Sequence, residues 1–244
     1  MAWLWTAMRW WAVPILKRYM RTTHLEGREH IPKKGAAIIA SNHLSALDHL
    51  VLPAMTRRTI YNISKKEHFD HKIRAWAFRG WGVIPLDRGK GDTNALDTAK
   101  RILRDGHLFC IYPEGTRSRD GHLHKGHTGV ARLALELDMP VIPVAMLGTY
   151  EKKPPGMKGV NKEGVTGGRA GPALSWPQYA GKHEDRKITR KVTDEIMQAI
   201  AELSGQKYVD EYTYNKAYDK NKDGKLDKKE QKAADEDPAI AHER

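Results

Sequence analysis

The residues best suited to chemistry form two short segments of the chain. In the first, Asn42-His43-Leu44-Ser45-Ala46-Leu47-Asp48, a histidine lies five residues before an aspartate. A carboxylate that accepts a hydrogen bond from one imidazole nitrogen fixes the ring tautomer, so the other nitrogen can act as a general base. The second segment, Tyr112–Ser118, contains Glu114, Gly115, Thr116 and Arg117. It offers a guanidinium and exposed backbone N–H groups to an anionic substrate.

No nucleophilic serine or cysteine accompanies this base. Ser41 and Ser45 flank His43, but neither lies on the glycine-flanked turn typical of nucleophilic serines, so both are interpreted as turn or cap residues. Cys110 lies in an apolar run and is interpreted as a buried structural thiol; a single cysteine also excludes an internal disulfide and is typical of a reducing compartment. The combination indicates direct transfer of a group to a hydroxyl on a phosphorylated acceptor.

Apolar runs alternate with amphipathic segments through the middle of the chain. They predict strands over 36–41, 59–63, 82–86, 108–112 and 140–147, and helices over 44–55, 67–78, 93–103, 128–137 and 188–200. Residues 152–171, rich in glycine and proline, are predicted to form a loop with one short strand. This alternation predicts an α/β fold with a mostly parallel mixed sheet flanked by helices. His43 then lies in the turn after the first strand, and Asp48 in the first turn of the helix that follows.

Three regions are expected: an interfacial amphipathic helix over 1–24, a domain over 25–204, and a helical tail over 205–244. Four of the seven tryptophans lie in the first region, interleaved with Arg9, Lys17 and Arg18. The charges exclude a simple spanning helix, whereas indole rings beside cations are typical of a helix in the membrane interface. The alternative is an amphipathic helix packed on its own domain. The segment 74–81 has the same mixture and extends the predicted membrane surface.

The charge of the chain is concentrated outside the tail. The net charge is +12, and residues 1–204 contain 33 Lys and Arg against 20 Asp and Glu. Such a surplus attracts anionic lipid headgroups or nucleic acid. Because no nucleic-acid-binding motif is present, we expect the partner to be a membrane surface with anionic lipids, and we expect no binding of nucleic acid.

Four segments together resemble the ordered motifs of the glycerolipid acyltransferase family, whose best-known members are bacterial 1-acyl-sn-glycerol-3-phosphate acyltransferases. They are Asn42-His43 with Asp48, Ile84-Pro85-Leu86-Asp87-Arg88, Glu114-Gly115-Thr116-Arg117 and Val141-Ile142-Pro143-Val144. The resemblance covers roughly Leu25 to Gly148, with the four motifs in family order. Four ordered motifs are a far more specific signal than one.

The resemblance implies a reaction and a role for each motif residue. His43, oriented by Asp48, would deprotonate the hydroxyl of lysophosphatidate, which then attacks the thioester of acyl-CoA and yields phosphatidate. Arg88 and Arg117 resemble the residues that bind the acceptor phosphate, and Lys65 is a third candidate cation. Glu114, Gly115 and Thr116 would shape the loop, and backbone N–H groups near Gly115 or Val144 would stabilise the oxyanion. No catalytic cofactor is implied, and a peripheral enzyme on the cytoplasmic face of a bacterial plasma membrane is expected.

Several alternatives stay open at this stage. Relatives with these motifs also use glycerol-3-phosphate or other lysolipids as acceptors, or acyl carrier protein as donor, and a non-catalytic membrane lipid-binding protein would keep the same fold. Arg88 and Arg117 could instead form structural ion pairs with Asp87 and Asp120. The histidine clusters at 68 and 71 and at 122, 124 and 127 are interpreted as solvated side chains rather than metal ligands.

The tail contains a separate pattern, outside the family resemblance. Asp219, Asn221, Asp223, Gly224, Lys225, Asp227 and Glu230 match positions one, three, five, six, seven, nine and twelve of the EF-hand loop over 219–230. The pattern predicts a Ca²⁺ site of a structural or weak kind. The alternative is a disordered charged tail that matches by composition.

Overall fold

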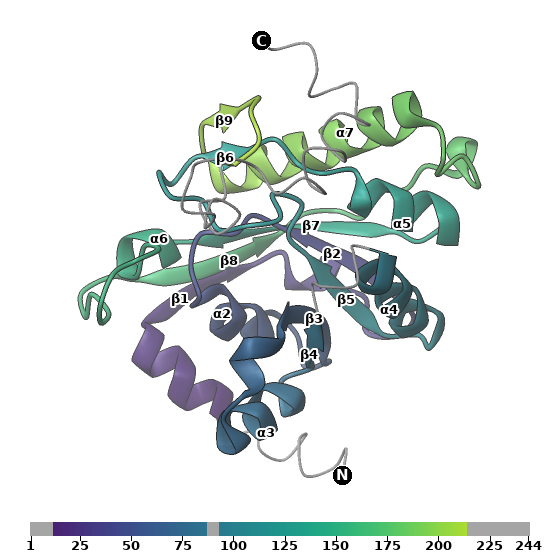
Figure 1. The fold of residues 1–244 in the computed structure, drawn as a ribbon. Coiled ribbons are helices and arrows are strands. Elements are labelled where there is room, and N and C mark those ends of the chain that lie inside the picture. Colours follow the sequence, from purple (N-terminus) through teal and green to yellow (C-terminus); the bar gives the residue numbers. More distant parts are fainter. Residues whose placement is uncertain (1–11, 87–92, 214–244) are drawn as a thin grey trace, which may run out of the picture. The chain divides into compact units, whose positions relative to one another are not determined.

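A computed structural model describes residues 12–86 and 93–213 of the chain (Figure 1). The chain divides into two compact units, residues 1–212 and 213–244, and the second lies outside the described residues except for Thr213. Within the first unit, residues 12–20 form a helix that leads into strand β1 (Thr22–Glu26). Residues 1–11, which carry the four N-terminal tryptophans, lie outside the described residues.

The centre of the first unit is a seven-stranded sheet with the strand order β1-β8-β7-β2-β5-β3-β4 (Figure 1). Neighbouring strands are parallel except β7 and β8, which are antiparallel. The other bounds are β2 Ala37–Ser41, β3 Ile60–Lys65, β4 Val83–Leu86, β5 Leu108–Ile111, β7 Val141–Leu147 and β8 Thr166–Ala170. The predicted fold class, a mostly parallel mixed sheet flanked by helices, is confirmed.

Helices connect most of the parallel strands, as such connections require. Besides the helix over 12–20, the α-helices of the described residues are α2 Asp48–Met55, α3 Lys72–Gly80, α4 Thr93–Arg104, α5 Gly129–Leu137, α6 Thr149–Lys152 and α7 Arg186–Ser204. The short 3₁₀ helices are η1 Arg28–His30, η2 Lys66–Phe69 and η4 Pro177–Tyr179. The helix predicted over 67–78 is therefore two helices. The chain bends at the exposed Asp70 and His71, and the rings of Phe69 and Phe78 then meet edge to face, with centroids 5.6 Å apart.

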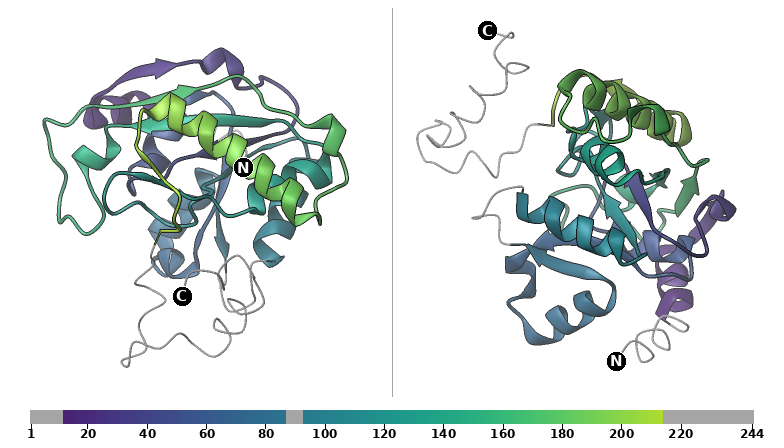
Figure 2. Two further views of the ribbon diagram at one scale, coloured as in Figure 1. Left: turned by 90° about the horizontal axis from the view of Figure 1, so that it is seen from above. Right: turned by 90° about the vertical axis from the view of Figure 1, so that its right-hand side faces the viewer.

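Alternate residues of β2 belong to two hydrophobic cores, one on each face of the sheet. Ile38 and Ala40 pack in the core that contains residues of α4, α5 and α7. Ala37 and Ile39 pack in the core that contains residues of α2. Figures 1 and 2 show α5 and α7 over one face and α2 on the other. All five residues of β2 are buried, which is typical of a strand covered on both faces, so the loop that follows at Asn42 starts from a rigid support.

The segment after α7 belongs to the first unit rather than to the tail. Helix α7 ends at Ser204 and is capped by Gly205, whose φ of 68° lies in the left-handed region. The chain then turns back along residues 121–125. Strand β9 (Tyr208–Val209) pairs with β6 (Leu123–His124) in a separate parallel sheet. The boundary between the compact units therefore lies at 212–213. The predicted tail begins earlier, at 205, because hydrogen bonds between the backbones of distant residues leave no pattern in the sequence.

Candidate active site

The chemistry-bearing loops gather at one edge of the sheet. Strands β2, β3, β4 and β5 are parallel, so their carboxyl ends lie at the same edge. The loop 42–48 follows β2, and the loop 112–118 follows β5. Lys65 is the last residue of β3 and pairs in register with Leu86, the last residue of β4. In open α/β sheets, ligands bind outside the carboxyl ends of the strands. This edge is therefore the candidate site.

His43 and Asp48 are hydrogen-bonded, as the sequence predicted. Nδ1 of His43 lies 2.8 Å from Oδ2 of Asp48, and the aspartate side chain is completely buried. The same oxygen accepts the backbone N–H groups of Leu44 and Ser45 at 2.8 and 2.9 Å. Asp48 is also the first residue of α2, where the helix dipole favours a carboxylate. The loop thus folds around one carboxylate oxygen and fixes the imidazole.

The imidazole presents its other nitrogen away from Asp48. Its Nε2 has no hydrogen bond among the described residues, and the side chain of His43 is 14% exposed. The ring of Tyr112 stacks on it, with centroids 4.0 Å apart and an angle of 17° between the planes. Sequence reasoning assigned no role to Tyr112. The hydrogen bond to Asp48 and the stacking on Tyr112 together fix the orientation of the ring and therefore the direction of Nε2.

Glu114 joins the two loops. Its Oε1 accepts the backbone N–H of His43 at 2.9 Å, and its Oε2 accepts the backbone N–H of His124 at 3.1 Å. Only 1% of the residue is exposed. Burial raises the pKa of Glu114 to about 7, against the two N–H donors and His124, which lower it. The buried carboxylate of Glu114 therefore links the backbone of the His43 loop to the backbone of β6. These contacts are of the kind expected for a residue that shapes the loop.

Gly115 makes the turn that exposes the rest of this loop. Its φ of 70° lies in the left-handed region, and its N–H donates to the carbonyl of Tyr112 at 2.9 Å. A Cβ at this position would lie 3.2 Å from Cδ2 of His127. The N–H of Gly115 is thus engaged in the turn, whereas the N–H groups of Thr116 and Arg117 have no partner within the part of the chain that the structure describes.

Arg117 is exposed and forms no ion pair within the described ranges. The alternative pairing with Asp120 is absent, because Asp120 binds His122 and His124 instead, at 3.1 and 3.0 Å. Burial raises the pKa of Asp120, but hydrogen bonds from His124, His122 and Ser118 outweigh it and lower the pKa overall. The guanidinium of Arg117 is therefore available to an anionic ligand.

The side chains of several residues predicted to bind phosphate or calcium are not described by the structure. Arg88 lies outside the described residues, as do the seven residues of the predicted calcium loop, Asp219, Asn221, Asp223, Gly224, Lys225, Asp227 and Glu230. For Lys65 only the backbone position is described, at the end of β3. Among the residues that are described, no group of three or more histidine, cysteine, aspartate or glutamate side chains could hold a metal ion.

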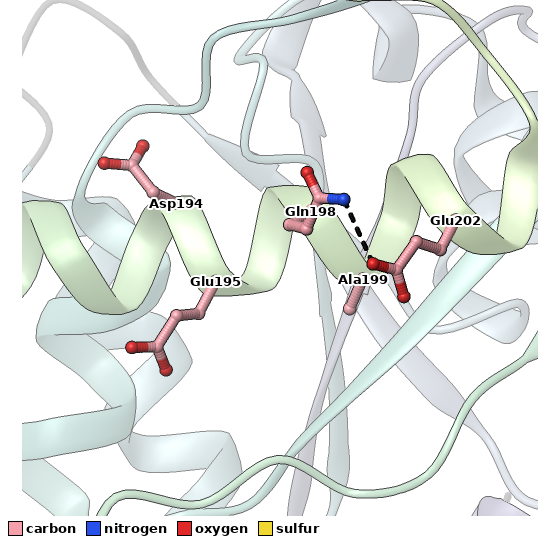
Figure 3. A pocket seen from close by; sticks show the side chains of 5 residues that line it. All are labelled: Asp194, Glu195, Gln198, Ala199 and Glu202. Atoms are coloured by element: carbon pink, nitrogen blue, oxygen red, sulfur yellow. Dashed lines mark hydrogen bonds between the residues drawn. The ribbon is translucent and has the colours of Figure 1, made fainter.

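A shallow hollow on the outer side of α7 is a different kind of feature. Its lining consists of Asp194, Glu195, Gln198, Ala199 and Glu202 (Figure 3). Gln198 donates to Glu202 at 3.0 Å along the helix. None of the residues of the two loops lines this hollow, and its carboxylates would repel a phosphate. The candidate site therefore stays at the edge of the sheet.

Within the described residues, no helix has both the length and the apolarity needed to cross a bilayer. Exposed apolar side chains are present, however, on the helix over 12–20. Ile15 and Tyr19 lie one turn apart and are 59% and 62% exposed.

The chain is similar to a known protein family over about half of its length. The family model described as Acyltransferase matches residues 22–147, a range that contains both loops and strands β1 to β7. The chain belongs to this family, and specifically to the glycerolipid acyltransferases.

Three similar proteins illustrate the relationship. The chloroplastic 1-acyl-sn-glycerol-3-phosphate acyltransferase LPAT1 of Arabidopsis thaliana is 31% identical over 161 residues, which are 65% of this chain and 44% of the plant protein. The chloroplastic 1-acyl-sn-glycerol-3-phosphate acyltransferase BAT2 of Brassica napus is 30% identical over 161 residues, which are 65% of this chain and 46% of the Brassica protein. The chain thus spans less than half the length of these curated relatives. The crystal structure of the 1-acyl-sn-glycerophosphate (LPA) acyltransferase PlsC from Thermotoga maritima superimposes with a TM-score of 0.63 at 25% identity and 80% coverage of both chains.

Proposed function

We propose that this protein is a 1-acyl-sn-glycerol-3-phosphate O-acyltransferase, which transfers a fatty acyl group from acyl-CoA to lysophosphatidate and forms phosphatidate. The observation that carries the proposal is the His43–Asp48 pair at 2.8 Å, at the carboxyl edge of the sheet in a chain of this family, with no partner for Nε2 of His43 among the described residues. The names of the similar plant enzymes and of PlsC support this choice of acceptor.

In the proposed reaction His43 acts as a general base. Its Nε2 takes the proton of the free hydroxyl of lysophosphatidate, and the hydroxyl oxygen attacks the thioester carbonyl carbon. The tetrahedral intermediate collapses when the C–S bond breaks, and the imidazolium returns the proton to the CoA thiolate. Asp48 stabilises the imidazolium during the step, since a buried carboxylate 2.8 Å from Nδ1 interacts strongly with positive charge. A thiolate is a good leaving group, so neither an acyl-enzyme nor a cofactor is required.

The loop 115–117 is the proposed anion-binding element. Arg117 is exposed without an ion pair among the described residues, and the N–H groups of Thr116 and Arg117 point to no partner there. Guanidinium and backbone N–H groups match the oxygens of a phosphate or an oxyanion. Lys65 is proposed to contribute to the phosphate site, because β3 ends with it at the same edge of the sheet. Arg88, which lies outside the described residues, is proposed as a further phosphate ligand from its sequence motif.

A substrate panel tests the proposal. Thiol release from palmitoyl-CoA is measured with 1-acylglycerol-3-phosphate, with glycerol-3-phosphate, with a lysolipid that lacks a terminal phosphate, and with no acceptor. Release that requires 1-acylglycerol-3-phosphate supports the proposal. Faster release with one of the other acceptors assigns that acceptor instead. No release with any of them, while vesicles still bind, favours a non-catalytic lipid-binding protein.

We further propose a peripheral location on an anionic membrane surface, at the cytoplasmic face of a bacterial plasma membrane. Exposed Ile15 and Tyr19 lie on one face of the helix over 12–20, and the body of the protein has a surplus of positive charge. Apolar and aromatic side chains beside cations are typical of helices that lie in the membrane interface.

The calcium loop over 219–230 is a separate proposal that rests on its sequence pattern. The ligand spacing predicts binding of one Ca²⁺ per chain. Isothermal titration of the full chain with CaCl₂ tests it against Glu230→Ala, which removes the bidentate ligand at the last position of the loop. Heat released by the wild type and abolished in Glu230→Ala supports the site; identical traces overturn it.

A further inference from the structure

We infer that Gln206 is a positioning residue of the active site, which holds the His43 loop and the Arg117 loop in a fixed relation. The inference deepens the proposed function, and rests on it for the roles of those two loops. Gln206 directly follows Gly205, the left-handed residue at which α7 ends. It lies outside the residues 22–147 that the family model matches, so none of the four motifs includes it.

The first contact of Gln206 is with Asn42, the neighbour of His43. Oδ1 of Asn42 accepts the N–H of Met146 at 2.7 Å, and its Nδ2 donates to the carbonyl of Met146 at 3.1 Å. The same Nδ2 donates to Oε1 of Gln206 at 2.6 Å. Asn42 is completely buried, and both hydrogens of its amide are used. Because a buried donor left without an acceptor is costly, Asn42 depends on the oxygen that Gln206 supplies.

The second contact of Gln206 closes a circuit of hydrogen bonds. Its Nε2 donates to the carbonyl of Gly121 at 2.7 Å, and the N–H of Gly121 donates to Oγ of Ser118 at 3.1 Å. The N–H of Ser118 in turn donates to the carbonyl of His43 at 2.8 Å. Since His43 follows Asn42 in the chain, the circuit returns to its start. Among the side chains of the circuit, only that of Gln206 bonds both to Asn42 in the His43 loop and to Gly121, three residues after the loop that carries Arg117.

The circuit passes directly beside the two groups that the reaction uses. Arg117 precedes Ser118, so the backbone that carries the proposed phosphate ligand is tied to the backbone that carries the base. A hydroxyl must meet Nε2 of His43 while its phosphate meets Arg117, and catalysis falls steeply when such groups shift by about 1 Å. Glutamine fits this position because one end of its amide accepts and the other donates. Glutamate keeps the acceptor but has no donor for Gly121.

Steady-state kinetics of the full chain test the assignment. We compare the wild type with Gln206→Ala, Gln206→Glu and the control Gln198→Ala, whose amide is exposed on α7 and donates to Glu202 in the same helix (Figure 3). Loss of the circuit is expected to lower kcat/KM for the acceptor by about tenfold or more in both Gln206 variants, with a higher acceptor KM and a donor KM within about twofold of the wild type.

A merely structural role would give a different result. Partial unfolding reduces the amount of active enzyme, so kcat falls while both KM values stay unchanged. That outcome in Gln206→Ala overturns the assignment, as does an acceptor kcat/KM within about twofold of the wild type and of Gln198→Ala.

Hydrogen exchange provides a readout that needs no turnover. In the wild type the N–H groups of Ser118 and Gly121 are held by the circuit. Exchange in peptides that cover residues 115–123 is expected to be about tenfold faster in Gln206→Ala and unchanged in Gln198→Ala. Equal exchange in all three proteins overturns the inference. If the wild type transfers no acyl group to any acceptor, the proposed function fails, whereas the exchange rates still decide whether Gln206 holds this loop.

Discussion

The carboxylate of Glu114 accepts the backbone N–H of His43 at 2.9 Å, and so joins the loop after β5 to the loop after β2. This hydrogen bond connects the third motif to the backbone of the residue proposed as the base. The imidazole of His43 is thereby left to Asp48 and to a substrate. The two loops are therefore joined in the fold, although the elements α2, β3, η2, α3, β4, α4 and β5 lie between them in the sequence.

The raised pKa of Glu114 predicts a pH-dependent contribution to stability. Burial raises this pKa from 4.5 to about 7 in the folded protein. A carboxyl with a raised folded pKa contributes stability that is fully present below its unfolded pKa and is lost as the pH rises through the folded one. The stability of the wild type relative to Glu114→Gln is thus expected to fall between pH 4.5 and about pH 7, by an amount on the order of 3 kcal/mol. Urea unfolding of both proteins at pH 5 and pH 8 measures it; an equal difference at both pH values contradicts the prediction.

Replacement of Asp48 by asparagine is expected to reduce kcat by about 10²- to 10⁴-fold, because the imidazolium loses its charged partner. The substitution keeps the size of a side chain that is completely buried. The matched control is Asp105→Asn, an exposed carboxylate just after α4. Turnover by Asp48→Asn at the rate of this control would exclude the proposed orienting role.

Truncation of Arg117 is expected to weaken binding of the acceptor selectively. A hydrogen bond to a charged group contributes about 1.5–3 kcal/mol, so Arg117→Ala is predicted to raise the acceptor KM by about 10- to 100-fold and to leave the donor KM nearly unchanged. Arg119→Ala, which changes an exposed arginine directly after this loop, is the control. Equal increases in both KM values of Arg117→Ala would show that the loop has lost its shape and that Arg117 has no specific phosphate role.

Charge placed on the helix over 12–20 is expected to weaken membrane binding. Ile15→Asp and Tyr19→Asp each put a carboxylate where an exposed apolar side chain now lies. Sedimentation with vesicles of phosphatidylglycerol and phosphatidylethanolamine is predicted to show less bound protein for both variants than for the wild type. Gln198→Asp adds the same charge on the exposed side of α7 and is expected to bind like the wild type. Unchanged binding of the Ile15 and Tyr19 variants would exclude this face as the membrane contact.

The parts of the fold and site that the sequence predicts are local. Strand β2 is an apolar run, and α2 follows it with helical spacing. His43 lies in the short loop between them, and Asp48 begins α2. Both partners of the His43–Asp48 hydrogen bond are thus set by neighbouring residues. The apolar runs of β5 and β7 are equally plain, because strands buried on both faces are almost continuously hydrophobic.

The parts that the sequence does not predict depend on distant backbone groups. Strand β1, with the sequence Thr-Thr-His-Leu-Glu, is polar because it lies at the edge of the sheet and is held by pairing with β8. The contact of Glu114 with the N–H of His124 and the contacts of Gln206 with Asn42 and Gly121 join side chains to partners that no periodicity relates. Such contacts become visible only when the chain is folded.

The central claim is that His43 is the general base of an acyl transfer. The most direct measurement is the initial rate of thiol release from palmitoyl-CoA with saturating 1-acylglycerol-3-phosphate, compared among the wild type, His43→Ala and His107→Ala. His107 is an exposed histidine just before β5 and serves as the matched control. The account predicts a rate in His43→Ala that is lower by about 10²-fold or more, with folding unchanged by circular dichroism, and a normal rate in His107→Ala. Acceptor-dependent release by His43→Ala at the rate of the wild type would contradict it.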